Sequence, residues 1–183
     1  MAGHDSLTSF VATSLLEYLA SSRLALEHVK DESWHPEDRG GPLGTASALV
    51  LLCVVDAIGA YLRYGPSVAV IDGKQRKIDG EKSKHFFVLN VPEYYGQDLS
   101  LKEIESIYEY RNLLAHNAAL AAGRPLLFHP ADPQIFPVFE DTRAINLPAL
   151  HNQSTVAVAK LLSSENLIEE SHAAKNIRLK TAG

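Results

Sequence analysis

The feature of this sequence that most constrains its fold is a nearly continuous apolar stretch, "ASALVLLCVVDAIGAYL", over residues 46–62. A helix that is apolar on all sides needs cover on all sides, so it belongs in the centre of a bundle or in a membrane. The stretch is short for a membrane span and carries Asp56 near its middle, where a carboxylate is costly in hydrocarbon. We therefore predict a buried helix at about residues 45–64 of a soluble helical bundle.

Two further helices are predicted nearer the ends of the chain. Residues 7–29 repeat apolar side chains at helical spacing and follow Asp5 and Ser6, either of which can serve as the N-cap. Pro148 is well placed as the first residue of a last helix, because proline lacks the N–H group that the first helical turn leaves unused. From about residue 165 onward we expect the chain to fray.

A fourth helix has the clearest start signal in the sequence. Ser100 and Glu103 have the S-x-x-E spacing of a capping box, in which each side chain accepts a hydrogen bond from the other residue's backbone N–H group. Gly123, followed by Arg124 and Pro125, marks its end. We therefore predict a helix over about residues 100–122.

The segments between these helices have strand and turn signals. Residues 67–79 place β-branched side chains around Asp72-Gly73, a dipeptide favoured in tight hairpin turns. Residues 84–98 predict a short helix or strand ended by Pro92. The proline-rich segment 124–147 predicts an extended excursion or second hairpin with Pro137 on an edge. The fold class is therefore mainly α: one domain over residues 1–183, a bundle of four to five helices with one or two small β-hairpin insertions.

Composition narrows the classes of function. With a net charge of −5 and a pI near 5.9, the chain lacks the basic excess with which proteins coat nucleic acid by bulk attraction. Cys53 is the single cysteine, so neither an intramolecular disulfide nor a thiol cluster for zinc can form. We expect a cytoplasmic protein without a metal or other cofactor.

An arginine interrupts the apolar face of the helix that begins near Ser100. The apolar positions on that face include Ile104, Ile107, Tyr108 and Leu114, and Arg111 lies between the last two. A guanidinium group is always charged, so at a core-facing position it needs an acid, a water-lined cleft or a bound anion. Asp56, the one charge in the apolar helix, is the partner that we predict.

His116 follows five residues later on a neighbouring polar stripe with Glu109 and Asn112. Asn112 lies one turn before His116, so its amide can orient the imidazole or a ligand of the imidazole. Positions five apart on a helix differ by about 140° in azimuth, so Arg111 and His116 do not share a face. A single site that contains both needs the length of the arginine or a second copy of the chain, which points to a dimer cleft.

The segment "YRNLLAHN" resembles the signature of the HEPN superfamily, which has an arginine, a polar residue and then a histidine near the end of a late helix. The match covers Arg111, Asn112 and His116, and an acid in an earlier helix, here Asp56, is also familiar in that superfamily. The resemblance implies an all-α bundle that dimerises through the motif helices and cleaves RNA without metal. It implies a toxin with a cognate antitoxin or other protein partner, an antiviral nuclease or an RNA-processing enzyme.

The residues of the motif suit that chemistry. An imidazole titrates near neutral pH, so His116 could remove the proton of a ribose 2′-hydroxyl and generate an internal nucleophile. The products would be a 2′,3′-cyclic phosphate and a free 5′-hydroxyl. Arg111 would stabilise the phosphorane charge through paired N–H donors, and Asn112 would hold the imidazole or a phosphate oxygen. Asp56 and Glu109 would support these three residues.

A weaker prediction concerns residues that could bind RNA outside the motif. Lys74, Arg76 and Lys77 form a basic cluster on the predicted hairpin, although neighbouring acids make a solvated hairpin tip the simpler interpretation. Tyr110 could stack on a base, whereas Tyr108 belongs to the apolar face and is predicted to lie in the core.

Two other interpretations of the motif remain open. Arg111 and Asp56 can form a buried bridge that only fixes helix packing, and His116 can be a surface histidine beside Glu109 or Asn112. A HEPN-type module without catalysis would instead dimerise or bind a partner or nucleotide, and a bundle with no site is a further alternative.

Overall fold

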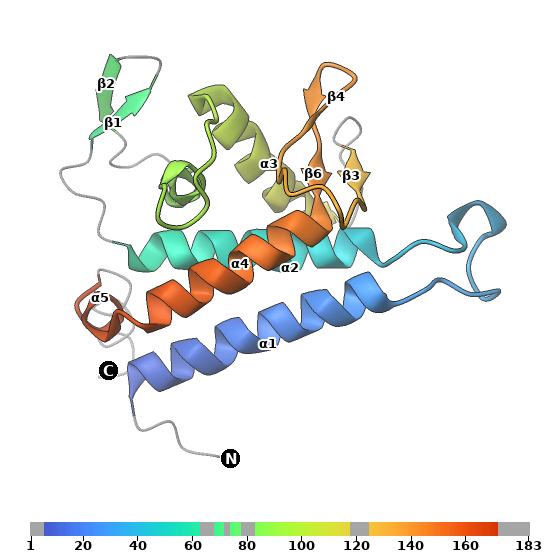
Figure 1. Cartoon of the computed structure of the whole chain (residues 1–183), viewed down its shortest axis with the longest axis horizontal. Coiled ribbons are helices and arrows are strands. Elements are labelled where there is room, and N and C mark those ends of the chain that lie inside the picture. The colour runs from blue at the N-terminus through green and yellow to red at the C-terminus, as the bar shows by residue number, and fades with distance from the viewer. Residues whose placement is uncertain (1–5, 63–67, 72–73, 78–82, 118–124, 172–183) are drawn as a thin grey trace.

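The computed structural model describes residues 6–62, 68–71, 74–77, 83–117 and 125–171. In this part of the chain the α-helices are α1 (Leu7–Glu27), α2 (Gly44–Tyr61), α3 (Leu101–Asn117), α4 (Leu147–Leu162) and α5 (Glu165–Glu169). Two 3-10 helices accompany them, η1 (Pro36–Asp38) and η2 (Lys84–Asn90). Figure 1 shows α1, α4 and α2 side by side, with η2 and α3 on the other side of α2 from α1. The predicted mainly helical bundle with small β insertions is confirmed.

Helix α2 is the centre of the bundle. It packs on α1, α4, η2 and α3, and its fully buried aliphatic side chains are Ala48, Leu51, Leu52, Val54, Val55 and Ile58. Burying each of the larger ones stabilises the fold by about 1.5–3 kcal/mol, which explains why this segment tolerates so little polarity. The helix begins and ends within three residues of its predicted limits.

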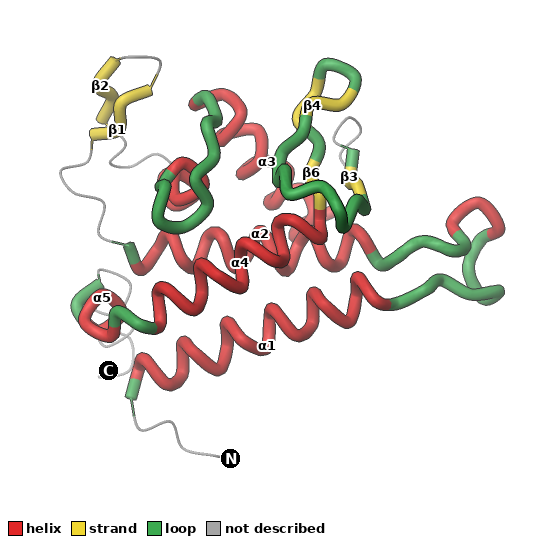
Figure 2. The backbone as a smooth tube through the Cα atoms, viewed as in Figure 1, coloured by secondary structure: helices red, strands yellow, loops and turns green. Residues whose placement is uncertain are grey.

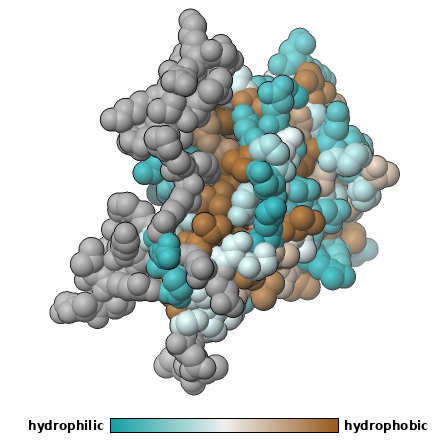
Figure 3. All heavy atoms as spheres, turned by 60° about the vertical axis from the view of Figure 1, so that its left-hand side comes forward, coloured by the Kyte–Doolittle hydropathy of each residue, from teal (hydrophilic) through white to brown (hydrophobic). Residues whose placement is uncertain are grey.

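By length and composition alone, α2 could also cross a membrane. Its neighbours instead cover it as they cover the core helix of a soluble bundle. On the face shown in Figure 3, hydrophobic patches of the described surface are interrupted by a band of hydrophilic residues. The prediction of a buried helix in a soluble bundle agrees with this packing, whereas the cytoplasmic location stays a prediction.

Within the described residues the strands form three short two-stranded pairings, which Figure 2 shows away from α1. Strands β1 (Val68–Ile71) and β2 (Lys74–Lys77) are antiparallel, with Ile71 opposite Lys74, so the predicted hairpin is present. Its turn, Asp72-Gly73, lies outside the described residues. The short segment after this hairpin forms the 3-10 helix η2, so the helical alternative was the correct one.

The proline-rich excursion contains the second hairpin. Strand β4 (Val138–Phe139) pairs antiparallel with β5 (Thr142–Arg143), and both turn residues, Glu140 and Asp141, have positive φ. Two such residues produce the twist that a tight hairpin needs. Strand β3 (Leu126–Leu127) pairs in parallel with β6 (Ile145–Asn146), directly before α4. The predicted non-helical excursion is therefore confirmed.

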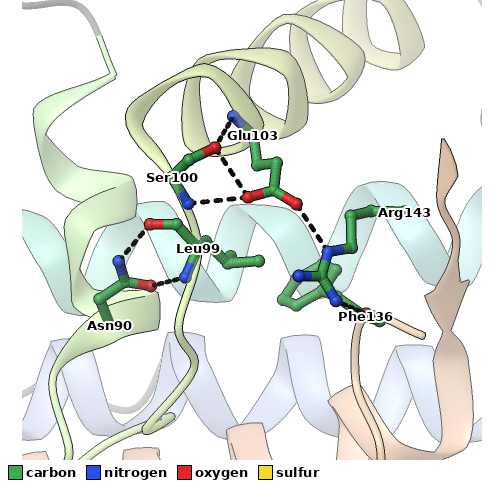
Figure 4. A network of polar contacts seen from close by, with 6 residues as sticks. All are labelled: Asn90, Leu99, Ser100, Glu103, Phe136 and Arg143. Atoms are coloured by element: carbon green, nitrogen blue, oxygen red, sulfur yellow. Dashed lines mark hydrogen bonds and ion pairs between the residues drawn. The ribbon is translucent and has the colours of Figure 1, made fainter. Parts of the chain in front are cut away.

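A polar network fixes the start of α3 and ties it to this excursion (Figure 4). The backbone N–H and hydroxyl of Ser100 donate to Oε2 of Glu103 at 2.8 and 2.7 Å, and the Glu103 N–H donates to the Ser100 hydroxyl at 3.3 Å. The capping box is therefore formed as predicted. Nε of Arg143 donates to the other carboxylate oxygen at 2.6 Å, and its Nη1 donates to the carbonyl of Phe136 at 3.1 Å.

The end of the described chain is more ordered than the sequence suggested. Residues 165–169, which we expected to fray, form the short helix α5, and Ile168 is fully buried. The carboxylate of Glu169 accepts hydrogen bonds from the backbone N–H and the hydroxyl of Thr8 on α1, at 3.1 and 3.0 Å. This contact between the two ends of the chain was not visible as a local pattern. Residues 172–183 lie outside the described part.

Candidate functional site

Arg111 and Asp56 meet between α3 and α2, as predicted. Nη2 of Arg111 lies 3.1 Å from Oδ2 of Asp56, and the two side chains are 25% and 26% exposed. The pair is therefore neither deep in the core nor on the open surface. Both charges keep access to solvent at one edge of the helix interface, where an anionic ligand could also reach the guanidinium.

Asn112 holds the same guanidinium. Its Oδ1 accepts a hydrogen bond from Nη1 of Arg111 at 3.1 Å. The sequence interpretation assigned this amide to His116 or to a phosphate oxygen, whereas in the structure it orients the arginine. A guanidinium has five N–H donors, so these two contacts leave others to bind an anion.

The Nε atom of Arg111 is buried and has no hydrogen-bond partner among the described residues. A buried donor left unsatisfied costs about 1–3 kcal/mol. A bridge that served only to fix helix packing would gain from satisfying this donor. The position of Arg111 is therefore more costly than packing alone requires.

His85 completes the cluster and is not among the site residues predicted from the sequence. Nδ1 of His85, on η2, lies 2.9 Å from Oδ1 of Asp56, the carboxylate oxygen that Arg111 does not contact. The imidazole is 33% exposed. Asp56 thus bridges an arginine from α3 and a histidine from η2. We call Asp56, His85, Arg111 and Asn112 the polar cluster.

Gly59 explains how His85 reaches α2. A Cβ atom at this position would lie 2.0 Å from the backbone oxygen of His85, far inside a van der Waals contact. Only glycine lets the backbone of η2 approach α2 this closely. Gly59 lies one turn after Asp56 on the same helix face, so the close approach brings His85 into reach of the carboxylate. A glycine within an apolar helix was the one sequence signal of this approach.

Cys53 lies near the polar cluster on α2. Burial, the largest influence, raises the pKa of its thiol, while the charge and hydrogen bonding of Arg111 oppose this rise. The thiol therefore stays protonated near neutral pH, which argues against a role as a nucleophile.

His116 and Glu109 lie apart from the polar cluster. Both side chains are exposed on α3, and His116 is in the last turn of the described helix. Arg111 and Asn112 are half-buried, so α3 presents the arginine to α2 and the histidine to solvent. Of the five predicted catalytic and supporting residues, the structure brings together Arg111, Asn112 and Asp56.

Both tyrosines of the motif segment, Tyr108 and Tyr110, pack with the hydrophobic core. Tyr110, which we considered for stacking on a base, is 2% exposed and belongs to the hydrophobic core, so that prediction was wrong. Tyr108 is only partly buried, and its ring packs edge to face on Phe86 at 5.7 Å. The predicted core contact of Tyr108 is therefore present, although its side chain is less buried than that of Tyr110.

The predicted RNA-binding residues outside α3 lie on one strand. Lys74, Arg76 and Lys77 lie on β2, but the positions of their side chains are outside the described part. Among the described residues, no group of three or more histidine, cysteine, aspartate or glutamate side chains could hold a metal ion.

The polar cluster has the parts needed for chemistry on a phosphate ester. It combines a fixed cation for phosphate oxygens, an imidazole that can exchange a proton and a carboxylate that orients both groups. All three charged or titratable side chains are partly exposed. A comparison of the chain with known protein families, curated proteins and solved structures found no match. The HEPN resemblance therefore rests on Arg111, Asn112 and His116 alone.

Proposed function

We propose that this protein is a metal-independent endoribonuclease that uses the 2′-hydroxyl of its substrate as the nucleophile. The observation that carries the proposal is the placement of Arg111, on the core-facing side of α3 but 25% exposed and held by Asp56 and Asn112. Held by a carboxylate and an amide, the guanidinium is preorganised, which is what stabilises a developing phosphorane charge.

Each motif residue then has one task. His116 removes the proton from the 2′-hydroxyl, which attacks the adjacent phosphorus and displaces the 5′-oxygen. Arg111 donates N–H groups to the phosphorane oxygens, and Asn112 and Asp56 fix its orientation. Because the reaction needs a 2′-hydroxyl, RNA is cleaved and DNA is not.

A second copy of the chain would place His116 and Arg111 in one cleft. His116 is exposed on α3, and Leu113, three residues earlier, is 40% exposed although it is a large apolar residue. Helices that meet through this face would bury Leu113 and bring each His116 toward the partner's motif. The proposed active form is therefore a homodimer that pairs through α3.

A binding module without catalysis is the second candidate function. The observation that favours it is the Arg111 to Asp56 ion pair itself, since a charge already neutralised within the chain can be a packing device. The net charge of −5 points the same way. In that case α3 would still dimerise or bind a partner, without cleaving RNA.

RNA cleavage in EDTA separates the two candidates. The purified chain is incubated with a panel of single-stranded and structured RNAs, beside His116→Ala and Arg111→Ala variants that are shown to be folded and unchanged in oligomeric state. We expect the wild type to leave 2′,3′-cyclic phosphate ends and each variant to lose about 10²-fold or more in rate.

Intact RNA at high wild-type concentration would contradict the nuclease. Equal cleavage by the wild type and both variants would show that the activity comes from another site or a contaminant. The identity of the RNAs that are cut would then distinguish the cellular roles that the resemblance implies. These roles are a toxin with an antitoxin, an antiviral nuclease and an RNA-processing enzyme.

A further inference from the structure

The polar cluster contains an imidazole that the motif does not include. His85 comes from η2, Asp56 from α2 and Arg111 from α3, so the cluster joins three separate elements of the fold. The two carboxylate oxygens of Asp56 contact different partners. Oδ1 lies 2.9 Å from Nδ1 of His85, and Oδ2 lies 3.1 Å from Nη2 of Arg111.

This arrangement fixes both the orientation and the tautomer of the imidazole. A carboxylate that accepts from Nδ1–H holds the ring in one position and places proton exchange at Nε2. The backbone of His85 is held as well, because η2 packs against Gly59 with no room for a Cβ atom. A histidine positioned by its side chain and its backbone is prepared for proton transfer in a defined direction.

We propose that His85 is a second catalytic imidazole, which protonates the 5′-oxygen that leaves when an RNA phosphodiester is cleaved. This inference rests on the proposed ribonuclease function and adds a residue to it. Cleavage of a phosphodiester is accelerated by a base at the nucleophile and by an acid at the leaving group. His116 supplies the first, and His85, beside the phosphate-binding Arg111, supplies the second.

The proton and bond changes balance without any further reactant. The 2′-oxygen passes its proton to His116 and forms a bond to phosphorus, while the bond from phosphorus to the 5′-oxygen breaks. Protonated His85 gives its Nε2 proton to the 5′-oxygen. It keeps its Nδ1 proton, which stays in the hydrogen bond that Nδ1–H donates to Asp56. The products are a 2′,3′-cyclic phosphate and a 5′-hydroxyl, and both imidazoles return to their starting states by exchange with water.

The net charge of the polar cluster suits an anionic substrate only when His85 is protonated. Asp56 and Arg111 cancel each other, so a neutral His85 leaves the cluster without net charge. A protonated His85 gives it one positive charge beside the phosphate. Exposure of 33% lets a substrate reach the ring, while Asp56 offsets the charge of the imidazolium.

The test uses the full chain and two versions of one RNA. The first is a single-stranded oligoribonucleotide with a linkage that the wild type cleaves. The second has sulfur in place of the bridging 5′-oxygen at that linkage, and a thiolate leaves without needing a proton. The variants are His85→Asn, His116→Ala and the control His35→Asn, which changes an exposed histidine in the loop between α1 and α2. Asparagine can still donate to Asp56 from the position of Nδ1 but has no counterpart of Nε2.

We expect His85→Asn to cleave the oxygen substrate about 10²- to 10⁴-fold more slowly than the wild type and the sulfur substrate within about 10-fold of it. His116→Ala should lose activity on both substrates, and His35→Asn on neither. Unchanged cleavage of the oxygen substrate by His85→Asn would overturn the inference and leave the nuclease intact. Equal losses on both substrates would assign His85 a structural role. A wild type that cleaves neither substrate would overturn the nuclease and this inference together.

Discussion

Helix α3 contributes one member to each of two arginine–carboxylate pairs, and the two pairs differ in how completely their hydrogen-bonding groups are satisfied. Near its start, Glu103 accepts from Ser100 and from Arg143, and Arg143 also donates to a backbone carbonyl (Figure 4). Near its other end, Arg111 shares Asp56 with a histidine and keeps a buried Nε without a partner among the described residues. The exposures of the two pairs are similar, at 32% and 30% for the first and 25% and 26% for the second.

The difference separates a structural clamp from a candidate site. The pair of Glu103 and Arg143 joins the start of α3 to the chain excursion before α4. Its hydrogen bonds hold these two segments together and stabilise the fold. The polar cluster around Arg111 holds the guanidinium in place but leaves its buried Nε without a partner among the described residues. Burial and ion pairing alone therefore do not distinguish the two roles, whereas the completeness of hydrogen bonding does.

The largest expected effect is that of Gly59→Ala, which should disrupt the polar cluster through its backbone. The new Cβ would meet the backbone of His85, so η2 has to move, and we expect a loss of about 3 kcal/mol in the free energy of unfolding. Urea denaturation measures this loss of stability. Gly44→Ala, on the same helix, is the control, because its Cβ would make ordinary contacts of 3.5 Å or more. Equal stabilities of the two variants would contradict the close approach.

Arg143→Met should remove the clamp. Glu103 would lose a charged donor at 2.6 Å while it keeps its hydrogen bonds to Ser100. We expect the free energy of unfolding to fall by about 2 kcal/mol, which is typical of hydrogen bonds to charged groups. The urea midpoint measures this change, and a variant as stable as the wild type would show that the clamp does not stabilise the fold.

Acid should weaken the clamp as well. Burial, the largest influence, raises the pKa of Glu103, but hydrogen bonds from Arg143 and Ser100 and the charge of Arg143 outweigh it and lower this pKa from 4.5 to about 2. The stabilisation is therefore complete above about pH 4.5 and is lost as the pH falls toward 2.

Between pH 5 and pH 3 we expect the clamp to lose on the order of 1 kcal/mol after solvent screening. Urea denaturation at several pH values measures the slope, and Arg143→Met should flatten it. An identical slope in the wild type and the variant would assign the acid sensitivity to other carboxylates.

The smallest expected effect on stability is that of Arg111→Met. This change removes an ion pair but also a buried unsatisfied donor, and Asp56 keeps its contact with His85. We expect the free energy of unfolding to fall by less than about 1 kcal/mol. A loss as large as that of Arg143→Met would remove the contrast between the two pairs and favour a packing role for Arg111.

Much of the fold could be predicted because its signals are local. The apolar stretch predicted the central helix, the S-x-x-E spacing predicted the capping box, and both hairpins followed from turn residues and prolines. Helix α5 was missed because five residues give no periodic pattern, and its position depends on Ile168 and on Thr8 at the other end of the chain.

The part of the site that could be predicted is the contact between Arg111 and Asp56, because an apolar helix face and an isolated charge mark these two residues in the sequence. Arg111 on an apolar face required an acid, and Asp56 was the one charge in the central helix. His85 is 29 residues from Asp56 and joins it only through the packing of η2 on α2. No spacing rule connects two such residues, although Gly59 marked a place where another backbone comes close. Tyr110, which was considered for stacking on a base, is buried beside the predicted apolar face, so helical periodicity did not fix the limits of that face.

The most direct test of the central claim compares Arg111→Lys with Arg143→Lys in RNA cleavage in EDTA, at a temperature where both variants are folded. Lysine keeps the positive charge of each pair but loses the planar fork of donors that binds a phosphate. We expect Arg111→Lys to cleave RNA about 10²-fold more slowly than the wild type, and Arg143→Lys to cleave it at nearly the wild-type rate. Equal rates for the two variants would contradict a functional difference between the pairs.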